Sequence, residues 1–126
     1  MHSSTMKNIL QVDDDVDHLC LCSVILSRQR YAVRTMPGCN NFNDLVNMVH
    51  DFRPALIFMD HSMPGISGLE ATRLLKANPL YARIPIIYFS GQDDVVQLAA
   101  AAGADECLRK NFYMPQLLEL TAKYIA

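Results

Sequence analysis

The stretch from Ala55 to Gly65 reads Ala-Leu-Ile-Phe-Met-Asp-His-Ser-Met-Pro-Gly and indicates more about the fold than any other part of the chain. Its first five residues are apolar and are expected to form a strand that ends at Asp60. Three other short apolar runs also end at polar groups that can carry chemistry. They are Ile9–Val12 before Asp13-Asp14-Asp15, Ile86–Phe89 before Ser90-Gly91, and Cys107-Leu108 before Lys110.

Amphipathic helical patterns separate these runs. We expect helices from Asp17 to Gln29, from Asn40 or Asn41 to Arg53, from the residue after Gly68 to Asn78 with Ala71, Leu74 and Leu75 inside, across Val95–Ala102, and around Leu117–Tyr124. The remaining strands are expected at Ala32–Thr35, Ile84–Phe89 and Glu106–Arg109. Regular alternation of strands and helices predicts an α/β fold, a doubly wound parallel sheet with helices on both faces.

If these runs are parallel strands, their carboxyl ends share one edge of the sheet. Ligands bind at that edge in such folds, near the point where the strand order reverses. Three acids, one hydroxyl and one ammonium would then meet in one pocket, from Asp13, Asp14, Asp60, Ser90 and Lys110. Such a set suits Mg²⁺-assisted transfer of a phosphoryl group onto a carboxylate.

The length of 126 residues and the apolar content of 51% suit one domain with a sizeable core. The net charge is −2 and no basic stripe is visible in the sequence, so direct binding of nucleic acid is not expected. No apolar run approaches the ~20 residues of a membrane span, and no signal peptide is recognisable.

The four cysteines match no zinc signature, and we expect them to be reduced thiols that act as small apolar groups. Cys20 and Cys22 should point to different faces of the first helix. Reduced thiols fit a cytoplasmic protein. Among the histidines, His18 and His50 are assigned no role, and alternation along the strand predicts that His61 points away from Asp60.

Four segments together resemble the receiver (CheY-like) domain of two-component response regulators. They are Ile-Leu-Gln-Val-Asp-Asp-Asp (9–15), Met-Asp-His-Ser-Met-Pro-Gly-Ile-Ser-Gly-Leu-Glu (59–70), Pro-Ile-Ile-Tyr-Phe-Ser-Gly (85–91) and Gly-Ala-Asp-Glu-Cys-Leu-Arg-Lys (103–110). The resemblance spans Ile9 to Ile125 and implies a (βα)5 flavodoxin-like fold with strand order 2-1-3-4-5. It also implies a receiver domain over residues 8–126, preceded by a disordered segment, 1–7.

The resemblance implies a role for each candidate residue. Asp60 would be the phosphoacceptor. Asp14 and Asp60 would bind Mg²⁺ through their carboxylates and Ser62 through its backbone carbonyl, while Asp13 would hold a metal-bound water. Lys110 would contact a phosphoryl oxygen, and Ser90 would hydrogen-bond the phosphoryl group in the active form. Asp15 is expected to cap the first helix instead.

Two positions depart from the family pattern. Cys107 stands where the family commonly has an aromatic ring that turns inward on activation. Asn111 stands where the family commonly has a proline, often after a cis bond. A cis bond before a non-proline residue costs about 2.5–4 kcal/mol, so a trans bond is expected here.

The resemblance therefore predicts a phosphoacceptor signalling domain that catalyses only its own phosphotransfer and autodephosphorylation. Its donor would be a histidine kinase or a histidine phosphotransfer protein. Phosphorylation would change the surface formed by the fourth helix, fifth strand and fifth helix, and so regulate a downstream effector or promote a dimer.

Three other functions occur on related folds or use a similar aspartate. A haloacid-dehalogenase phosphohydrolase needs a second aspartate two residues after the first, where Ser62 stands. A flavodoxin needs a Ser/Thr/Gly-rich phosphate loop after the first strand, where Asp13-Asp14-Asp15 would repel the phosphate. A non-phosphorylated interaction module on the same fold stays open because of Cys107 and Asn111.

Overall fold

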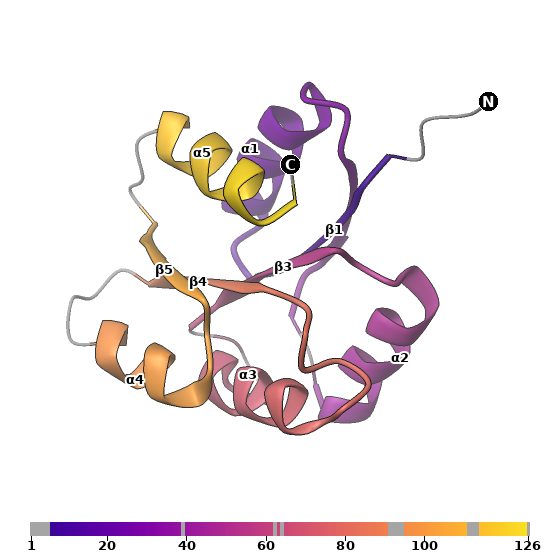
Figure 1. The fold of residues 1–126 in the computed structure, drawn as a ribbon, viewed down its shortest axis with the longest axis vertical. Helices are drawn as coiled ribbons and strands as arrows, with labels where there is room; N and C mark the ends of the chain where they lie inside the picture. Colours follow the sequence, from indigo (N-terminus) through magenta and orange to yellow (C-terminus); the bar gives the residue numbers. More distant parts are fainter. Residues whose placement is uncertain are drawn as a thin grey trace.

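The computed structural model describes residues 6–38, 40–61, 63, 65–90, 95–110 and 114–125, with the backbone alone of Met114. Strands and helices alternate along it (Figure 1), in the order β1 (Asn8–Val12), α1 (Val16–Ser27), β2 (Ala32–Met36), α2 (Phe42–Phe52), β3 (Leu56–Asp60), α3 (Gly68–Ala77), β4 (Ile86–Ser90), α4 (Val95–Ala102), β5 (Glu106–Arg109) and α5 (Met114–Ile125). Residues 1–5 lie outside this description, so the disordered segment 1–7 stays a prediction.

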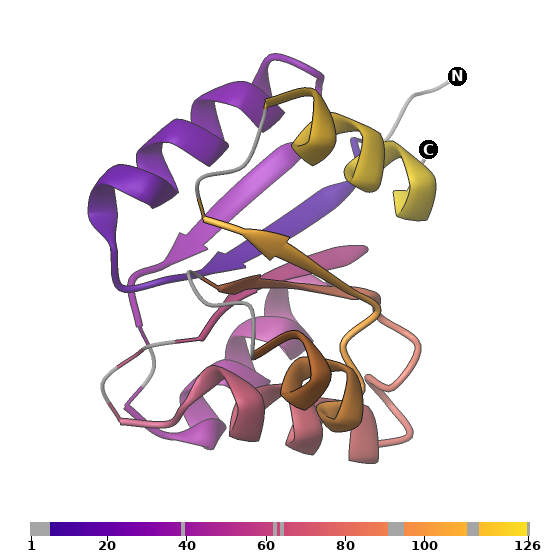
Figure 2. The ribbon, with the colours of Figure 1, turned by 90° about the vertical axis from the view of Figure 1, so that its left-hand side faces the viewer.

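The strands form one parallel sheet in the order β2-β1-β3-β4-β5, which confirms the predicted topology. Helices α1 and α5 cover one face, and α2, α3 and α4 cover the other (Figures 1 and 2). The order reverses between β1 and β3, where Asp13 directly follows β1 and Asp60 is the last residue of β3. None of the helices that the structure describes is long and apolar enough to cross a membrane.

Alternate side chains of the central strands build two apolar layers. Leu10 and Ile57 pack on the side of α2, α3 and α4, whereas Ile9, Phe58 and Phe89 pack on the side of α1 and α5. Strands β3 and β4 are buried along their whole length. This is the burial expected of central strands in a sheet that is covered on both faces.

Local sequence sets most helix ends as predicted. The side chain of Asp15 accepts a hydrogen bond from the backbone N–H of His18 and caps α1, and Asn41 caps α2 in the same manner. Helix α3 begins at Gly68, one residue earlier than predicted, after the cap residue Ser67, and its C-cap is Asn78, before the proline.

Three other boundaries or faces differ from the prediction. Helix α1 ends at Ser27, because the chain turns there and Arg30 adopts a φ of 66°. Strand β4 begins at Ile86 and not at Ile84, since Ile84 closes a turn by donating to the carbonyl of Tyr81. In α3 the buried residue next to Ala71 is Thr72, and Leu74 is only half-buried.

Helix α3 approaches the end of β3 very closely at Gly68. A Cβ atom at this position would overlap the carbonyl oxygen of Asp60 and would lie 2.7 Å from the hydroxyl oxygen of Tyr88. The backbone N–H of Gly68 also donates to the carbonyl of His61 at 3.3 Å. The missing side chain therefore lets helix α3 start directly against the end of β3.

We expect Gly68→Ala to destabilise the domain by about 1–3 kcal/mol, because the added methyl group must displace backbone at the end of β3. The free energy of unfolding in urea would measure this loss. Arg73→Ala is the matched control, since Arg73 lies on the same helix with its side chain 59% exposed. This control should change stability by less than about 0.5 kcal/mol, and equal losses in both variants would contradict the contact at Gly68.

Candidate functional site

The predicted site residues meet at the carboxyl ends of four strands. Asp13 follows β1, Asp60 and Ser90 are the last residues of β3 and β4, and Lys110 follows β5. The backbone N–H of Lys110 donates to the carbonyl of Ser90 at 3.0 Å, which ties the end of β5 to the end of β4. Asp14 follows Asp13 and completes the group.

Asp60 is the most enclosed carboxylate of the site, with only 1% of the residue exposed. Its Oδ1 atom lies 3.0 Å from the ammonium nitrogen of Lys110. Its Oδ2 atom is buried and has no hydrogen-bond partner within the described part of the chain. A buried carboxylate oxygen without a partner is costly, and it indicates a site that a cation or a reacting group can complete.

Asp13 is buried as well, but both of its oxygens have partners. Oδ1 accepts from the backbone N–H of Asp15 at 2.9 Å and from the Lys110 ammonium at 3.2 Å. Oδ2 accepts from Nδ1 of His18 at 2.7 Å. Asp13 is therefore held in one orientation by three donors, two from the start of α1 and one from the residue that follows β5.

The carboxylates of Asp13, Asp14 and Asp60 can place one oxygen each within 4.8 Å of one another. Asp14 is exposed, so the cluster opens to solvent on its side. Oxygen ligands with room for water are what Mg²⁺ prefers, and the unpartnered Oδ2 of Asp60 fits the same ion. Ser62, predicted to add its backbone carbonyl, lies outside the described residues.

The surroundings of the two buried carboxylates shift their pKa values in opposite directions. Burial raises the pKa of Asp60 to about 7, and the charge of Asp13 adds to this effect although the Lys110 ammonium counteracts it. Burial acts in the same direction on Asp13, yet hydrogen bonds from His18 and Asp15 and the charge of Lys110 hold its pKa below the usual value. A further cation would favour the ionised form of Asp60.

Lys110 remains a cation in this setting. Burial alone would lower its pKa, but the hydrogen bond to Asp60 and the negative charge of Asp13 raise it above the usual value. The Lys110 ammonium group therefore pairs with two carboxylates, those of Asp13 and Asp60. If an anion enters the site, the ammonium group can also donate to the oxygens of that anion.

His18 belongs to the site, although the sequence alone assigns it no role. Besides its bond to Asp13, its Nε2 atom lies 3.7 Å from the sulfur of Cys22. Its ring meets that of Phe89 edge-on, with the ring centres 4.7 Å apart. Burial would lower the pKa of His18, but the hydrogen bonds to Asp13 and Cys22 raise it to about 9. The helical spacing of His18, Cys22 and Leu26 was a usable signal that His18 faces inward.

His61 is a packing residue, as expected from its place after Asp60. Its Nδ1 atom lies 2.8 Å from the hydroxyl oxygen of Tyr88, which is fully buried on β4. Burial raises the pKa of Tyr88 above its usual range, so the hydroxyl keeps its proton. The backbone N–H of His61 donates to Phe89 at 3.1 Å, and its carbonyl accepts from Gly68. The segment after Asp60 is thus tied to β4 and α3.

Cys107 lies directly opposite Tyr88 in the β4–β5 register. It is half-buried and packs against the same core layer as Tyr88. Burial raises the pKa of its thiol, so it behaves as a small apolar group. The predicted trans bond at Asn111 concerns a residue outside the described part of the chain.

Residues 9–122 match the sequence pattern of the response regulator receiver domain family. The chain therefore belongs to this family. This membership excludes the phosphohydrolase and flavodoxin alternatives.

The chain is 32% identical over 114 residues to the phosphate regulon transcriptional regulatory protein PhoB of Pseudomonas aeruginosa, covering 89% of this chain and 48% of PhoB. It is 28% identical over 122 residues to the CAI-1 autoinducer sensor kinase/phosphatase CqsS of Vibrio cholerae, covering 94% of this chain and 17% of CqsS.

Among solved structures, the signal receiver domain of a response regulator from Bermanella marisrubri aligns with a TM-score of 0.85 at 30% identity, covering 97% of this chain and 100% of that one. The chain spans about half the length of PhoB and of the DNA-binding response regulator MtrA, which is another relative.

We expect Tyr88→Phe to lower the free energy of unfolding by about 0.5–1.5 kcal/mol, because it removes the hydrogen bond to His61 and nothing else. Tyr31→Phe is the control, since no hydrogen bond of the Tyr31 hydroxyl is found within the described residues. Urea unfolding of both variants measures the difference. In a double-mutant cycle with His61→Ala, the loss from Tyr88→Phe should disappear; a loss that persisted would place its cause elsewhere.

Proposed function

We propose that this domain accepts a phosphoryl group on Asp60 from a phosphohistidine donor and reports the event through a change of surface. The observation that carries the proposal is the state of the Asp60 carboxylate. It is buried, one oxygen lies 3.0 Å from Lys110, the other has no partner in the described chain, and two more carboxylates stand beside it. Most buried side-chain polar atoms in proteins have a hydrogen-bond partner, so the unpartnered oxygen supports a functional role for Asp60.

In the proposed transfer, an oxygen of Asp60 forms a bond to phosphorus while the bond between phosphorus and the donor's imidazole nitrogen breaks. The imidazole leaves with the bonding electrons, and Asp60 becomes an acyl phosphate. Lys110 already lies at hydrogen-bond distance from Asp60, so it can donate to a phosphoryl oxygen after a small movement. Water that later attacks phosphorus releases inorganic phosphate and restores the carboxylate, and this is the only catalysis we propose.

Two like-charged reactants meet in this step, so the negative charge must be offset. Bound Mg²⁺ would neutralise part of the charge on the carboxylate and on the phosphoryl oxygens. Asp14 and Asp60 would hold the ion through their carboxylates, with Ser62 through its carbonyl. Asp13 would act through water, since its own oxygens are occupied by His18, Asp15 and Lys110.

The donor must reach the acid pocket, and helix α1 offers an apolar surface beside it. Val16, Leu21 and Val24 are 61%, 51% and 52% exposed, and Val16 follows Asp14 by two residues. A helix of a histidine kinase or of a histidine phosphotransfer protein could pack there. The similarity to CqsS, named a sensor kinase/phosphatase, supports a place in such a relay. The three thiols described are free, which suits a cytoplasmic location.

The output would involve α4, β5 and α5. Ser90 lies at the end of β4 next to the phosphoacceptor, so a phosphoryl group on Asp60 could draw its hydroxyl inward and shift α4. Cys107 has no large ring to move, and Tyr88 already fills the buried position opposite it. The change would bias binding of a downstream effector or formation of a dimer as a population shift.

Cys107 also favours the second candidate function, an interaction module that acts without phosphorylation. The phosphoacceptor hypothesis predicts that acetyl phosphate labels the domain, whereas the interaction-module hypothesis predicts no labelling. The same experiment therefore separates the two.

We expect acetyl phosphate with Mg²⁺ to add the mass of one phosphoryl group to the wild type and none to Asp60→Asn. Intact mass spectrometry measures the product. Asp51→Asn is the matched control, because Asp51 is an exposed aspartate that lies outside the acid pocket. EDTA should abolish labelling, since charge neutralisation permits the attack. Labelling of Asp60→Asn at the level of the control would refute the assignment.

We expect Ser90→Ala to keep the phosphoryl label but to weaken the conformational response, because the hydroxyl is the group that would follow the phosphoryl oxygen. Cys107→Ala should leave the response nearly unchanged. Amide NMR shifts of α4 and β5 upon addition of beryllofluoride, a phosphoryl mimic, measure the response. The proposed route fails if Cys107→Ala erases these shifts while Ser90→Ala preserves them.

A further inference from the structure

The edge of the sheet opposite the acid pocket carries a row of cations. Lys7, Arg30, Arg53 and Arg83 each lie shortly before a strand, namely β1, β2, β3 and β4 in that order. Because the sheet order is β2-β1-β3-β4, these positions follow one another along the edge as Arg30, Lys7, Arg53 and Arg83. Neighbouring strands are about 4.8 Å apart, so the four positions span roughly 15 Å of that edge.

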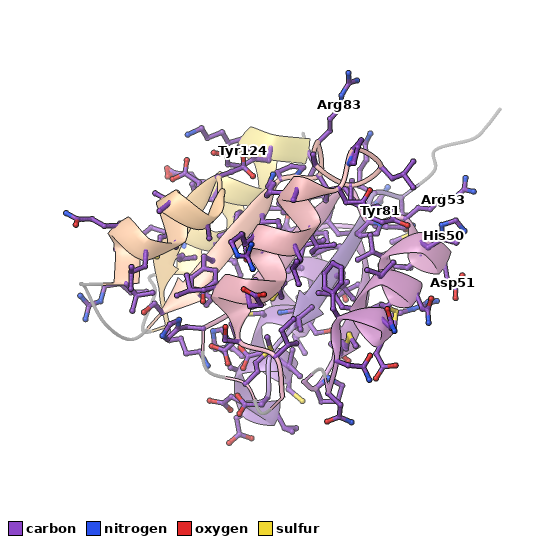
Figure 3. All side chains as sticks on the ribbon, turned by 90° about the horizontal axis from the view of Figure 1, so that it is seen from below. His50, Asp51, Arg53, Tyr81, Arg83 and Tyr124 are labelled. Atoms are coloured by element: carbon purple, nitrogen blue, oxygen red, sulfur yellow. The ribbon has the colours of Figure 1, made fainter. Side chains whose placement is uncertain are left out.

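These cations are available to a partner. All four are exposed, and none forms an ion pair within the described chain. The acids at the β5 end of the edge are already paired, Asp105 with Lys76 at 2.8 Å and Glu106 with Lys123 at 2.8 Å. Tyr124, labelled in Figure 3, donates a further hydrogen bond to Glu106 at 2.8 Å.

A pocket of about 290 Å³ opens in this row, next to Arg53. Its lining is an apolar floor with a polar rim, formed by Val49, His50, Arg53, Pro54, Leu80, Tyr81 and Ile84. The hydroxyl of Tyr81 lies 3.4 Å from Nδ1 of His50 and joins the two walls. In Figure 3, His50, Arg53 and Tyr81 lie at the same end of the molecule, and Arg83 projects from it. Asp51 is the exposed acid nearby.

The apolar surface continues beyond the pocket. Leu80, on the turn that follows α3, is 78% exposed and has the highest exposure among the large hydrophobic side chains described. A small anion would fill the pocket and leave Leu80 in water. A polypeptide can cover Leu80, insert a side chain into the pocket and reach the cations on either side.

We infer that this amino-terminal edge docks an acidic segment of a partner protein, in which one apolar side chain enters the pocket and neighbouring carboxylates face Arg53 and Arg83. The charge of the row selects an acidic partner, since a basic segment would meet unpaired like charges. The apolar floor of the pocket selects a protein over nucleic acid, whose phosphates would gain nothing from Val49 and Ile84. This inference does not depend on phosphorylation of Asp60, because the two surfaces lie at opposite ends of the strands.

A random peptide library displayed on phage tests the inference without a known partner. Selection on the immobilised 126-residue chain should enrich peptides that place Phe, Leu or Trp beside two or more acidic residues. Synthetic versions should shift the amide NMR signals of Val49, Tyr81 and Ile84 in a saturable manner. Raising the salt concentration should weaken their binding, because exposed charges are screened.

Arg53→Glu and Arg83→Glu should each weaken binding of the selected peptides by roughly tenfold, and Leu80→Ser by a similar factor. Arg73→Glu is the matched control, since Arg73 is an exposed arginine on α3 that already pairs with Glu70 at 2.6 Å. It should leave binding unchanged. Circular dichroism verifies that each variant is folded.

Several results would overturn the inference. They are enrichment of basic or uncharged peptides, failure to enrich any peptide, shifts that map away from the pocket, and equal losses with Arg73→Glu. Tighter binding of duplex DNA through Arg53 and Arg83 would identify a nucleic-acid surface instead and would equally overturn it. None of these results bears on labelling of Asp60, so the proposed function stands or falls separately.

Discussion

The ammonium group of Lys110 is the contact on which the site depends. It reaches Asp13 at 3.2 Å and Asp60 at 3.0 Å, and so joins the ends of β1, β3 and β5 across the switch point of the sheet. Without it, the buried carboxylate of Asp60 would face that of Asp13 with no cationic partner of its own among the described residues, a costly arrangement in a protein interior. The parallel sheet brings the acids together, and the lysine makes their proximity tolerable.

Hydrogen bonds around the acids then fix their orientation. His18 and the backbone of Asp15 hold Asp13, while Tyr88 holds His61 and, through it, the chain directly after Asp60. These contacts come from α1 and β4, so the site is part of the core and not an addition to its surface. Substitutions in either element can therefore change the chemistry of the pocket without touching a carboxylate.

Much of this could be predicted from the sequence, because strand ends and helix caps are local features. The runs that end at Asp13, Asp60 and Ser90 fixed the edge of the sheet, and Asp15 was a recognisable cap. The contacts of His18 and the pairing of His61 with Tyr88 were not predictable, since they depend on how separate elements meet. The start of β4 was misplaced because apolar Ile84 continues the strand pattern although its backbone closes a turn.

The cations at one end of the strands and the carboxylates at the other give the molecule a dipole moment along its sheet. A protein of net charge −2 would on average be repelled by an acidic surface, yet this one can turn its basic end toward such a surface as it approaches. A basic surface would meet the acid pocket first. The electrostatic torque that turns the molecule is screened beyond the Debye length of about 8 Å at physiological salt. It therefore acts only when the two surfaces are already close. The orientation of the molecule before contact would then distinguish acidic from basic partners by charge alone.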